Sequence, residues 1–536
     1  MMAGILDLPT ELITGILQYL DDRDIFAARQ TSTHVERTSF SFFAKRFFRK
    51  KGYLITSKSL HVLSSVAAHH ELRKHVQHVW FNPDCFTFAT PDYVGDTNDE
   101  NDEEAGVYGS LGDPVLKPGS DLSDVEMSRY QAYRDCLLDH AELLYTGRLE
   151  DELTAALRTL PNLKAIGMRR SEDHRPWGWR LLRDAVGHDP RDLGLIPTGP
   201  MRKLSGPTQL FIGLIRSLAA SGVQLQRLYT DAVEIDNIPS RTLPDDMLVK
   251  ACNSILYIEL NATKGWLEQV RMPATRAHYR CLDDPRQYGE GLSRLLNATP
   301  NLREIGLQIF PDRKQSHLIP PLPRQPDSWR QSYQYLAVQH LVSHTHFSHL
   351  RRVKLEKFTT SPVNLIAMLK PSATSLTSLK LRDIRLLPDK ALSANPTQSQ
   401  QQEHDQARPW QPVFAFLPSC HNLTYLLLNH LTHPTGSIRF IVELIPLPPP
   451  DPSVPRLETV ANAGDFADYD NITVEAGRPN WESGKGLLRQ VELREAREEV
   501  QRRVQGLAEG HWYGRNIFSY AMDETIWHTD TSDEEW

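Results

Sequence analysis

The sequence predicts an α/β protein in which an N-terminal three-helix bundle is followed by an irregular αβ solenoid with long insertions. Three observations favour this fold. Short amphipathic segments fill residues 1–52, a leucine pattern recurs through residues 53–465, and polar stretches interrupt that pattern. Residues 466–536 are expected to form a C-terminal cap helix and an acidic tail. The 536-residue chain is therefore divided into a helical module, a repetitive body and a cap.

The composition is that of a globular protein from a reducing compartment. Hydrophobic residues make up 40% of the sequence, and the formal net charge of −7 provides no overall basic field to attract nucleic acid. The five cysteines include no C-x-x-C pair and indicate reduced thiols. The sequence contains neither a secretory-signal pattern nor an apolar run of membrane-spanning length. We therefore expect a cytoplasmic and/or nuclear protein that binds neither nucleic acid nor a membrane.

The first predicted helix begins at Leu8-Pro9. Proline suits the first helical position because its missing N–H has no partner there, and Glu11 complements the positive helix end. Apolar residues then recur at spacings of three and four and form one stripe, which comprises Leu12, Ile13, Ile16, Leu17 and Leu20.

Two further short helices are expected in this module. Asp21-Asp22 can cap the second helix, which turns Ile25 inward. The third helix is expected to begin at a T-x-x-E capping box at Thr33 and to stop at Gly52. Its buried face is marked by Phe40, Phe43 and Phe47. So small a bundle cannot hide all of these apolar side chains, which indicates a partner surface.

This N-terminal segment resembles the F-box family. The family pattern has Leu-Pro, an acidic residue, spaced Ile and Leu residues, and then Asp-Ile with a following Arg. The matching residues are Leu8, Pro9, Glu11, Ile13, Ile16, Leu17, Leu20, Asp24, Ile25 and Arg29. The chain departs from the pattern at Gln30-Thr31-Ser32, where many F-boxes continue Leu-Val-Cys. The alternative is an ordinary three-helix cap whose Leu-Pro start is coincidental.

A strand-like unit of the form L-x-x-L-x-L recurs through the body. Its copies begin at Val76, Leu163, Ile255, Leu302, Leu350, Leu376 and Leu423, with weaker copies at Leu225 and Leu457. Apolar residues two positions apart share one strand face, which no single copy can bury alone. Stacking into a parallel solenoid, with outer helices such as 210–220, 292–298 and 363–370, buries these faces together.

The unit resembles a degenerate leucine-rich repeat, and its combination with an F-box resembles the F-box proteins of fungi. Three copies also begin alike, with Pro-Asn-Leu ending at Leu163 and Leu302 and His-Asn-Leu ending at Leu423. First positions lie 26 to 87 residues apart, whereas regular repeats span about 20–29 residues. Long insertions are therefore expected. The alternative is an irregular α/β domain with coincidental leucine spacing.

The expected insertions are recognisable by composition. Residues 91–128 are polar and acidic, residues 387–412 are rich in serine and glutamine, and residues 171–208 carry Trp177 and Trp179. The two tryptophans can either anchor a partner or tuck against the body. A charged helix is expected over residues 486–508 as the terminal cap.

The resemblance to the F-box family implies a substrate-recognition subunit of an SCF-type (Skp-cullin-F-box) ubiquitin ligase. The F-box would bind a Skp-family adaptor and, through it, a cullin and a RING protein, while the repeat body would hold a protein substrate. The adaptor-binding candidates, some of which must serve the internal core instead, are Leu8, Pro9, Leu12, Ile13, Ile16, Leu17, Leu20 and Ile25. The alternatives are a leucine-rich-repeat scaffold and a non-ligase complex of the Skp adaptor without a role in ubiquitination.

Substrate binding is expected on the strand-lined face and on the insertions. Basic residues lie at or beside the variable strand positions, where side chains point away from the leucine ladder. They are Arg303, Arg352, Lys354, Lys380 and Arg382. These residues predict a locally basic strip suited to an acidic or phosphorylated segment, with Trp177 and Trp179 as further candidates. A solvated face without a ligand is the alternative.

No motif predicts catalysis. His340 and His344 would share a helix face, but the glutamate of a metalloprotease pair is absent because Leu341 and Val342 follow His340. Around Gly484 the spacing does not fit a phosphate-binding loop. We therefore expect a non-catalytic protein with no metal and no cofactor.

Overall fold

The computed structural model describes most of the chain, with gaps. The described residues are 8–83, 124–169, 175–187, 206–231, 233–262, 288–309, 333–387, 409–433, 436–443, 485–488, 490–494, 501, 504–505 and 512–515. The chain divides into two compact units, residues 1–358 and 359–536, and each is described by itself. No helix in the described ranges is both long enough and apolar enough to cross a membrane.

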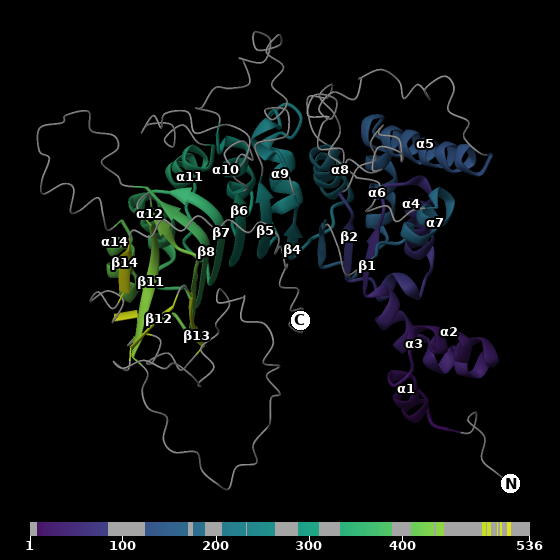
Figure 1. Ribbon diagram of the computed structural model, residues 1–536. Coiled ribbons are helices and arrows are strands. Elements are labelled where there is room, and N and C mark those ends of the chain that lie inside the picture. Colours follow the sequence, from purple (N-terminus) through teal and green to yellow (C-terminus); the bar gives the residue numbers. More distant parts are fainter. Residues whose placement is uncertain are drawn as a thin grey trace, which may run out of the picture. The chain divides into compact units, whose positions relative to one another are not determined.

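Three helices form the N-terminal bundle, as expected (Figure 1). They are α1 (Thr10–Gln18), α2 (Asp22–Thr31) and α3 (Thr33–Phe48). Asp21 caps α2 by accepting the N–H of Asp24 at 2.8 Å. The predicted capping box at Thr33 is wrong by one residue. Ser32 has the extended backbone of an N-cap, and its hydroxyl accepts the N–H of His34 at 3.1 Å.

The bundle encloses a small core of Ile13, Leu17 and Ile25, each at most 2% exposed. Half-buried aromatic side chains of α3 pack against it, among them Phe43. The guanidinium of Arg29 lies 3.9 Å from the centre of the Phe43 ring and donates to the Ser39 hydroxyl at 3.0 Å. This arrangement fastens α2 to α3.

The third helix ends before Gly52, contrary to the expectation from sequence. The chain enters strand β1 (Lys50–Tyr53) immediately after α3. A Cβ atom at residue 52 would lie 2.1 Å from the indole of Trp80 on strand β2, so glycine is required here by close approach and not by a helix stop. The sequence pattern alone did not distinguish these two roles.

The first unit contains seven parallel strands that lie side by side in chain order. They are β1, β2 (His78–Phe81), β3 (Ala165–Met168), β4 (Arg227–Tyr229), β5 (Tyr257–Ala262), β6 (Glu304–Ile309) and β7 (Arg352–Thr360). In the predicted units from Val76 to Leu350, the first apolar position lies two residues before a strand and the later ones lie on it, which confirms a parallel sheet.

The apolar positions of successive units form continuous rows. One register row, whose members are at most 3% exposed, comprises Val79, Ile166, Leu228, Ile258, Ile305 and Val353. A second row comprises Leu260, Leu307 and Leu355. Each such side chain contributes about 1.5–3 kcal/mol when moved from water into the core, so the rows are a main source of stability.

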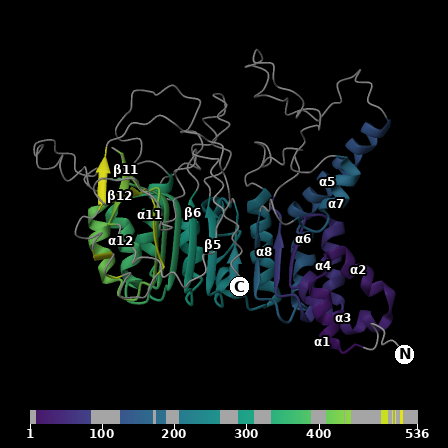
Figure 2. The ribbon, with the colours of Figure 1, turned by 60° about the horizontal axis from the view of Figure 1, so that its bottom comes forward.

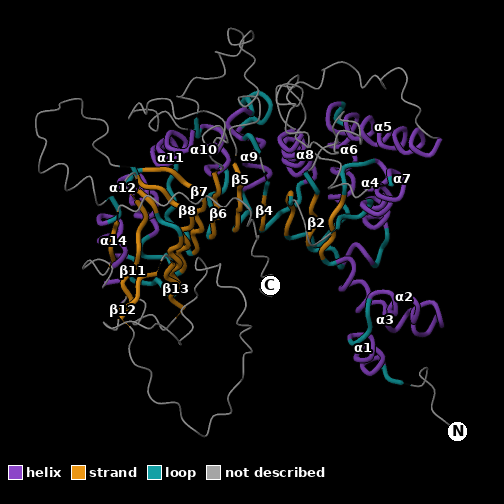
Figure 3. The backbone as a smooth tube through the Cα atoms, viewed as in Figure 1, coloured by secondary structure: helices purple, strands orange, loops and turns teal. Residues whose placement is uncertain are grey.

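Helices follow the strands and line one side of the sheet in this unit (Figures 1 and 3). Neighbouring helices in this layer pack against each other. They are α4 (Ser57–Ala68), α6 (Arg148–Arg158), α8 (Gly206–Ser221), α9 (Asp245–Cys252), α10 (Glu290–Asn297) and α11 (Tyr333–His344). The helices expected at 210–220 and 292–298 correspond to α8 and α10. Short 3₁₀ turns lie at Leu72–Lys74 and Ile235–Asn237.

An asparagine stands at the entry to three of the strand units. Its side-chain amide hydrogen-bonds to a backbone carbonyl that lies just before the preceding strand unit in each case. The Asn162 amide donates to the Lys74 carbonyl at 2.7 Å, and the Asn301 amide donates to the Asn253 carbonyl at 2.9 Å. In the second compact unit, the Asn422 amide donates in the same way to the Thr374 carbonyl, which lies at the end of the helical segment before the strand unit of Leu376. These hydrogen bonds explain why the strand units share Pro-Asn-Leu or His-Asn-Leu at their start. The asparagine amide donates to a carbonyl at a helix C-terminus, which has no hydrogen-bond partner within the helix.

Asn301→Ala is expected to lower the free energy of unfolding by about 1 kcal/mol, since it removes one hydrogen bond between units. Asn253→Ala is the matched control because it retains the backbone acceptor, and its effect should stay within about 0.5 kcal/mol. Chemical denaturation of both variants checks this. Equal effects would contradict the role of the Asn301 amide.

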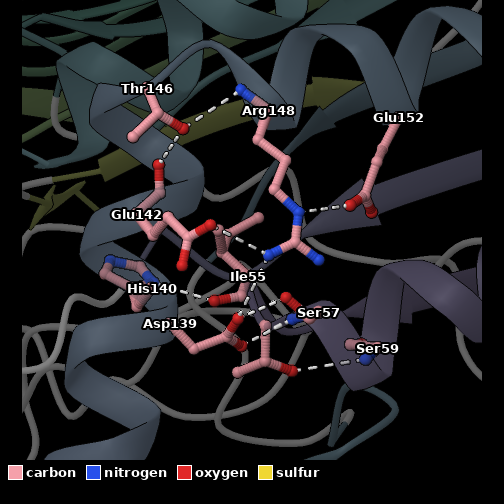
Figure 4. A network of polar contacts seen from close by, with 10 residues as sticks. Ile55, Ser57, Ser59, Asp139, His140, Glu142, Thr146, Arg148 and Glu152 are labelled. Carbon is pink, nitrogen blue, oxygen red and sulfur yellow. Dashed lines mark hydrogen bonds and ion pairs between the residues drawn. The ribbon is translucent and has the colours of Figure 1, made fainter.

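Parts of the expected insertions are helical. Helix α5 (Asp124–Tyr145) follows the acidic segment, and α7 (Trp179–Val186) lies inside the segment 171–208. The two helices pack on each other. Figure 4 shows how α5 is joined to α4: Asp139 accepts hydrogen bonds from the backbone N–H and the hydroxyl of Ser57. Arg148 at the start of α6 lies within 3.9 Å of the same carboxylate.

The second unit contains both parallel and antiparallel strand pairs. Strands β8 (Ser378–Leu386) and β9 (Tyr425–Asn429) are parallel, and their leucines at 379, 381, 426 and 428 are fully buried. Helix α12 (Pro362–Leu369) matches the expected helix 363–370. The remaining elements are Lys370–Ser372, α14 (Gln411–Phe416), Leu417–Ser419, β10 (Thr432–His433), β11 (Gly436–Glu443), β12 (Lys485–Leu488), β13 (Gln490–Arg494) and β14 (Trp512–Arg515). Figure 2 gives a second view of the elements of both units.

The cap helix expected over residues 486–508 is wrong for residues 486–488 and 490–494, which lie in β12 and β13. Strand β13 pairs antiparallel with β9, and β12 pairs antiparallel with β11. Residues 490–494 alternate polar and apolar, which suits a strand, and the open edge of β9 supplies the hydrogen bonds. The weak copy at Leu457 and most of the acidic tail lie outside the described residues.

Candidate functional site

Helix α1 exposes a stripe of apolar side chains that the bundle does not bury. Leu12, Ile16 and Tyr19 are 55%, 41% and 90% exposed. They occur at spacings of four and three residues, so they share one side of the helix. We call these three residues the α1 stripe. The neighbouring positions Ile13 and Leu17 are each 2% exposed and fill the core, so the bundle is stable without covering the stripe.

The structure divides the eight predicted adaptor-binding residues into two groups. Ile13, Leu17 and Ile25 are core residues, and Leu8 and Leu20 pack half-buried against that core. The exposed members are Pro9, Leu12 and Ile16.

Sequence reasoning missed two exposed apolar residues of the bundle. Tyr19 is one, and Phe26 of α2, 46% exposed, is the other. Tyr19 continues the spacing of Leu12 and Ile16, so it was recognisable from the sequence as a member of the same stripe. Phe26 was recognisable as an aromatic residue directly after the buried Ile25.

The chain thus combines a helical module that has an exposed apolar stripe with a parallel αβ body. Comparison with family models identifies the module: residues 5–41 match the F-box domain. The chain thus carries an F-box domain, a domain that in general binds Skp-family adaptors and serves substrate adaptors of SCF-type ligases. Comparison of the chain with curated proteins found no match.

The predicted basic residues of the first unit do not form a strip of unpaired cations. Lys354 on β7 lies 3.3 Å from a carboxylate oxygen of Glu259 and 3.4 Å from one of Glu356. Arg352 lies 3.6 Å from Glu304. The parallel register places Arg352 opposite Glu304 on the adjacent strand, and Lys354 reaches Glu259 across Gly306 of the intervening strand β6, so this part of the face is a row of ion pairs.

The other three predicted basic residues have separate surroundings. Arg303 is exposed at the entry to β6. In the second unit, the Lys380 ammonium lies 5.2 Å from the centre of the Tyr425 ring, and Arg382 lies 3.8 Å from Asp383. These two residues belong to a different compact unit from Arg303, Arg352 and Lys354.

The Glu259–Lys354 pair favours the charged forms of both groups. Burial opposes ionisation of Glu259, but Lys354 and the Tyr257 hydroxyl outweigh it and lower the pKa of the carboxyl. Burial likewise opposes the charge on Lys354, yet Glu259 and Glu356 raise its pKa. Because the carboxyl pKa is lower in the folded state than in the unfolded state, the carboxylate stabilises the fold at pH values above the unfolded-state pKa. This contribution is lost as the pH falls through the folded-state pKa.

Glu259→Gln is expected to lower the thermal midpoint at neutral pH, with a cost of up to about 1 kcal/mol because the pair is partly exposed. The difference from the unmodified protein should shrink between about pH 5 and pH 3, as the carboxylate is protonated. Thermal melts of the variant and the unmodified protein across this range measure it. A difference that does not vary with pH would exclude the ion pair as its source.

The two tryptophans of segment 171–208 lie against the body, which was the second of the alternatives drawn from the sequence. Trp179, a predicted substrate-binding residue, is only 3% exposed and packs in a cluster with Leu54, Leu137 and Leu182. Trp177 is half-buried and accepts the N–H of Leu54 through its carbonyl at 3.2 Å. Burial among Leu54 and residues of α5 and α7 leaves the indole little exposed surface, so the structure gives no support to Trp179 as a partner anchor.

Three side chains of reactive types, His140, Cys252 and Cys420, have structural surroundings in the described parts of the chain. His140 lies in the network with Ser57 and Asp139, but its Nδ1 donates to the Ile55 carbonyl at 2.9 Å and not toward the serine (Figure 4). Burial raises the pKa of the Cys252 thiol to about 12 and that of Cys420 to about 11, so neither thiol ionises readily.

The predicted histidine pair lies on α11 with its rings stacked, and the ring centres of His340 and His344 are 4.0 Å apart. Burial, and then the charge of His344, lowers the pKa of His340. Ser293 lies 3.1 Å from the Nδ1 atom of His340. Within the described ranges, no three or more His, Cys, Asp or Glu side chains are grouped to hold a metal ion. The absence of a bound metal stays a prediction, which metal analysis of the purified protein tests.

Proposed function

We propose that the protein is the substrate-recognition subunit of an SCF-type ubiquitin ligase. The observation that carries this proposal is the F-box match over a bundle whose core is complete and whose α1 stripe is exposed. In this proposal the stripe binds the Skp-family adaptor, and a cullin and a RING protein join through the adaptor. The protein itself supplies proximity: it raises the effective concentration of substrate lysines near the ubiquitin-transfer machinery. We place this activity in the cytoplasm, the nucleus or both.

We further propose that the body is a degenerate leucine-rich-repeat-like solenoid that binds the substrate. Support comes from parallel strands in chain order with a helical layer on one side, and from the recurring asparagine bonds. The second residue after the last leucine of the strand unit also has an equivalent left-handed conformation in three copies, at Lys357, Asp383 and His430, with φ of 55°, 54° and 50°. Equivalent backbone conformations at equivalent positions are typical of repeats.

Affinity purification under proteasome inhibition tests the proposal. The full chain should recover the adaptor, a cullin and the substrate, whereas Ile16→Asp should recover the substrate alone. A truncated chain should start at residue 49, because removal of residues 1–52 would delete most of strand β1. Recovery of the adaptor without a cullin would support a non-ligase complex and contradict the ligase. Adaptor recovery by Ile16→Asp would contradict the use of the α1 stripe.

A further inference from the structure

The last residue of the α1 stripe is a tyrosine that is almost fully exposed. Tyr19 is 90% exposed, compared with 55% for Leu12 and 41% for Ile16. It is the C-cap residue of α1, and its backbone N–H donates to the Ile16 carbonyl at 3.1 Å, so its main chain is held by the helix. No described residue forms a hydrogen bond with its hydroxyl. The stripe therefore ends in a phenolic hydroxyl that is open to solvent.

An acidic segment follows this tyrosine in the chain. Residues 21–24 are all exposed and consist of three aspartates and Arg23. Asp22 lies 2.8 Å from Arg46 of α3, whereas Asp21 and Asp24 form no salt bridge among the described residues. The segment therefore carries a net negative charge beside Tyr19. An exposed tyrosine followed by carboxylates suits a protein kinase that selects its substrates by charge pattern.

A phosphate on the Tyr19 hydroxyl would oppose docking of the α1 stripe. It would add a charge of about −1.5 to −2 at neutral pH, next to side chains that are apolar. Placing that charge in an apolar contact removes its water without supplying a partner. The phosphate would also stand at the C-terminal end of α1, where the helix dipole is negative, and the neighbouring aspartates would repel it.

We propose that Tyr19 is a phosphorylation site and that its modification releases the protein from the Skp-family adaptor. The inference rests on the proposed function, to which it adds a means of regulation. The modifying enzyme is a protein tyrosine kinase, and ATP is the phosphoryl donor. The Tyr19 oxygen bonds to the γ-phosphorus, the bond from that phosphorus to the bridging oxygen breaks, ADP leaves, and the hydroxyl proton passes to a base of the kinase. An adaptor bound to the stripe covers the same hydroxyl, so docking and phosphorylation exclude each other.

The test treats the full chain with a recombinant tyrosine-kinase domain that prefers acidic substrates, together with ATP and Mg²⁺. Mass spectrometry of the tryptic peptide 1–23, in which Tyr19 is the only tyrosine, should show the phosphate. Titration calorimetry with purified adaptor should then give binding at least about tenfold weaker than that of the untreated protein. A phosphatase should restore the affinity, and saturation with adaptor before kinase treatment should slow the modification of Tyr19.

Tyr19→Phe is the matched control because it keeps the aromatic ring in the stripe and removes the phosphate acceptor. Untreated, this variant should bind the adaptor with the affinity of the unmodified protein. After kinase treatment it should still do so, although other tyrosines of the chain are then phosphorylated wherever the kinase reaches them. Circular dichroism melts of the treated and untreated proteins confirm that each is folded.

Three results would overturn the inference: no phosphate on Tyr19 of the free chain, unchanged adaptor affinity after Tyr19 is phosphorylated, or an equal loss of affinity in kinase-treated Tyr19→Phe. In each of these cases the untreated protein still binds the adaptor, and the ligase proposal stands. Absence of adaptor binding by the untreated protein would count against the ligase proposal, and the inference would fall with it.

Discussion

Ile16→Asp is expected to abolish binding of the Skp-family adaptor while the rest of the protein stays folded. Ile16 is 41% exposed at the centre of the α1 stripe, so the substitution costs the bundle little, yet it places a charge in an apolar contact. Loss of a central anchor weakens binding by about 2 kcal/mol or more, which is about 30-fold in Kd. Titration calorimetry with purified adaptor measures the change.

Two further substitutions on α1 make this result specific. Gln18→Asp adds the same charge on the opposite side of the helix, at an exposed position, and should bind the adaptor normally. Leu17→Asp buries a charge in the bundle core and should unfold the module. Equal adaptor affinity of Ile16→Asp and the unmodified protein would exclude the α1 stripe as the docking surface. Leu8→Ala with Pro9→Ala should also weaken binding, since this pair leads into α1.

Trp179→Ala is expected to destabilise the first unit by about 3–5 kcal/mol, the usual cost of removing a buried large aromatic side chain. The indole is 3% exposed and packs with Leu54, with residues of α5 and with Leu182 of its own helix α7, so the truncation leaves a cavity that this cluster cannot close fully. The measurement is urea denaturation followed by circular dichroism. Adaptor binding should be unaffected at temperatures at which the variant is folded.

Trp177→Ala is the comparison for this variant. Its hydrogen bonds to Gly52, Leu54 and Ser59 are made by its backbone, which the substitution retains. We therefore expect a clearly smaller loss of stability than for Trp179→Ala. A larger loss at residue 177, or a loss of substrate recovery without any loss of stability at residue 179, would show that the assignment of Trp179 to the core is mistaken.

Much of the fold was predictable because apolar spacing and helix capping depend on residues that are close together in the sequence. The strand units were recognisable from apolar residues two positions apart, and in the copies from Val76 to Leu423 the apolar positions after the first lie on strands in the described parts of the chain. The α1 spacing and the Asp21 cap were equally readable. The asparagine entries were visible as a repeated motif, but their hydrogen bonds to the preceding unit were not, since the acceptor lies 48 residues away for Asn301.

Local patterns were enough to predict the N-terminal module, the strand units and the helices α8, α10 and α12, because propensity, capping and periodicity act over a few residues. Only the tertiary structure decided which face each residue presents to which neighbour. Register brought Glu259 to Lys354 and Tyr229 onto Gly167, packing buried Trp179, and strand pairing made residues 485–488 and 490–494 extended. These outcomes depend on contacts between residues far apart in the chain, whose energies no local pattern contains.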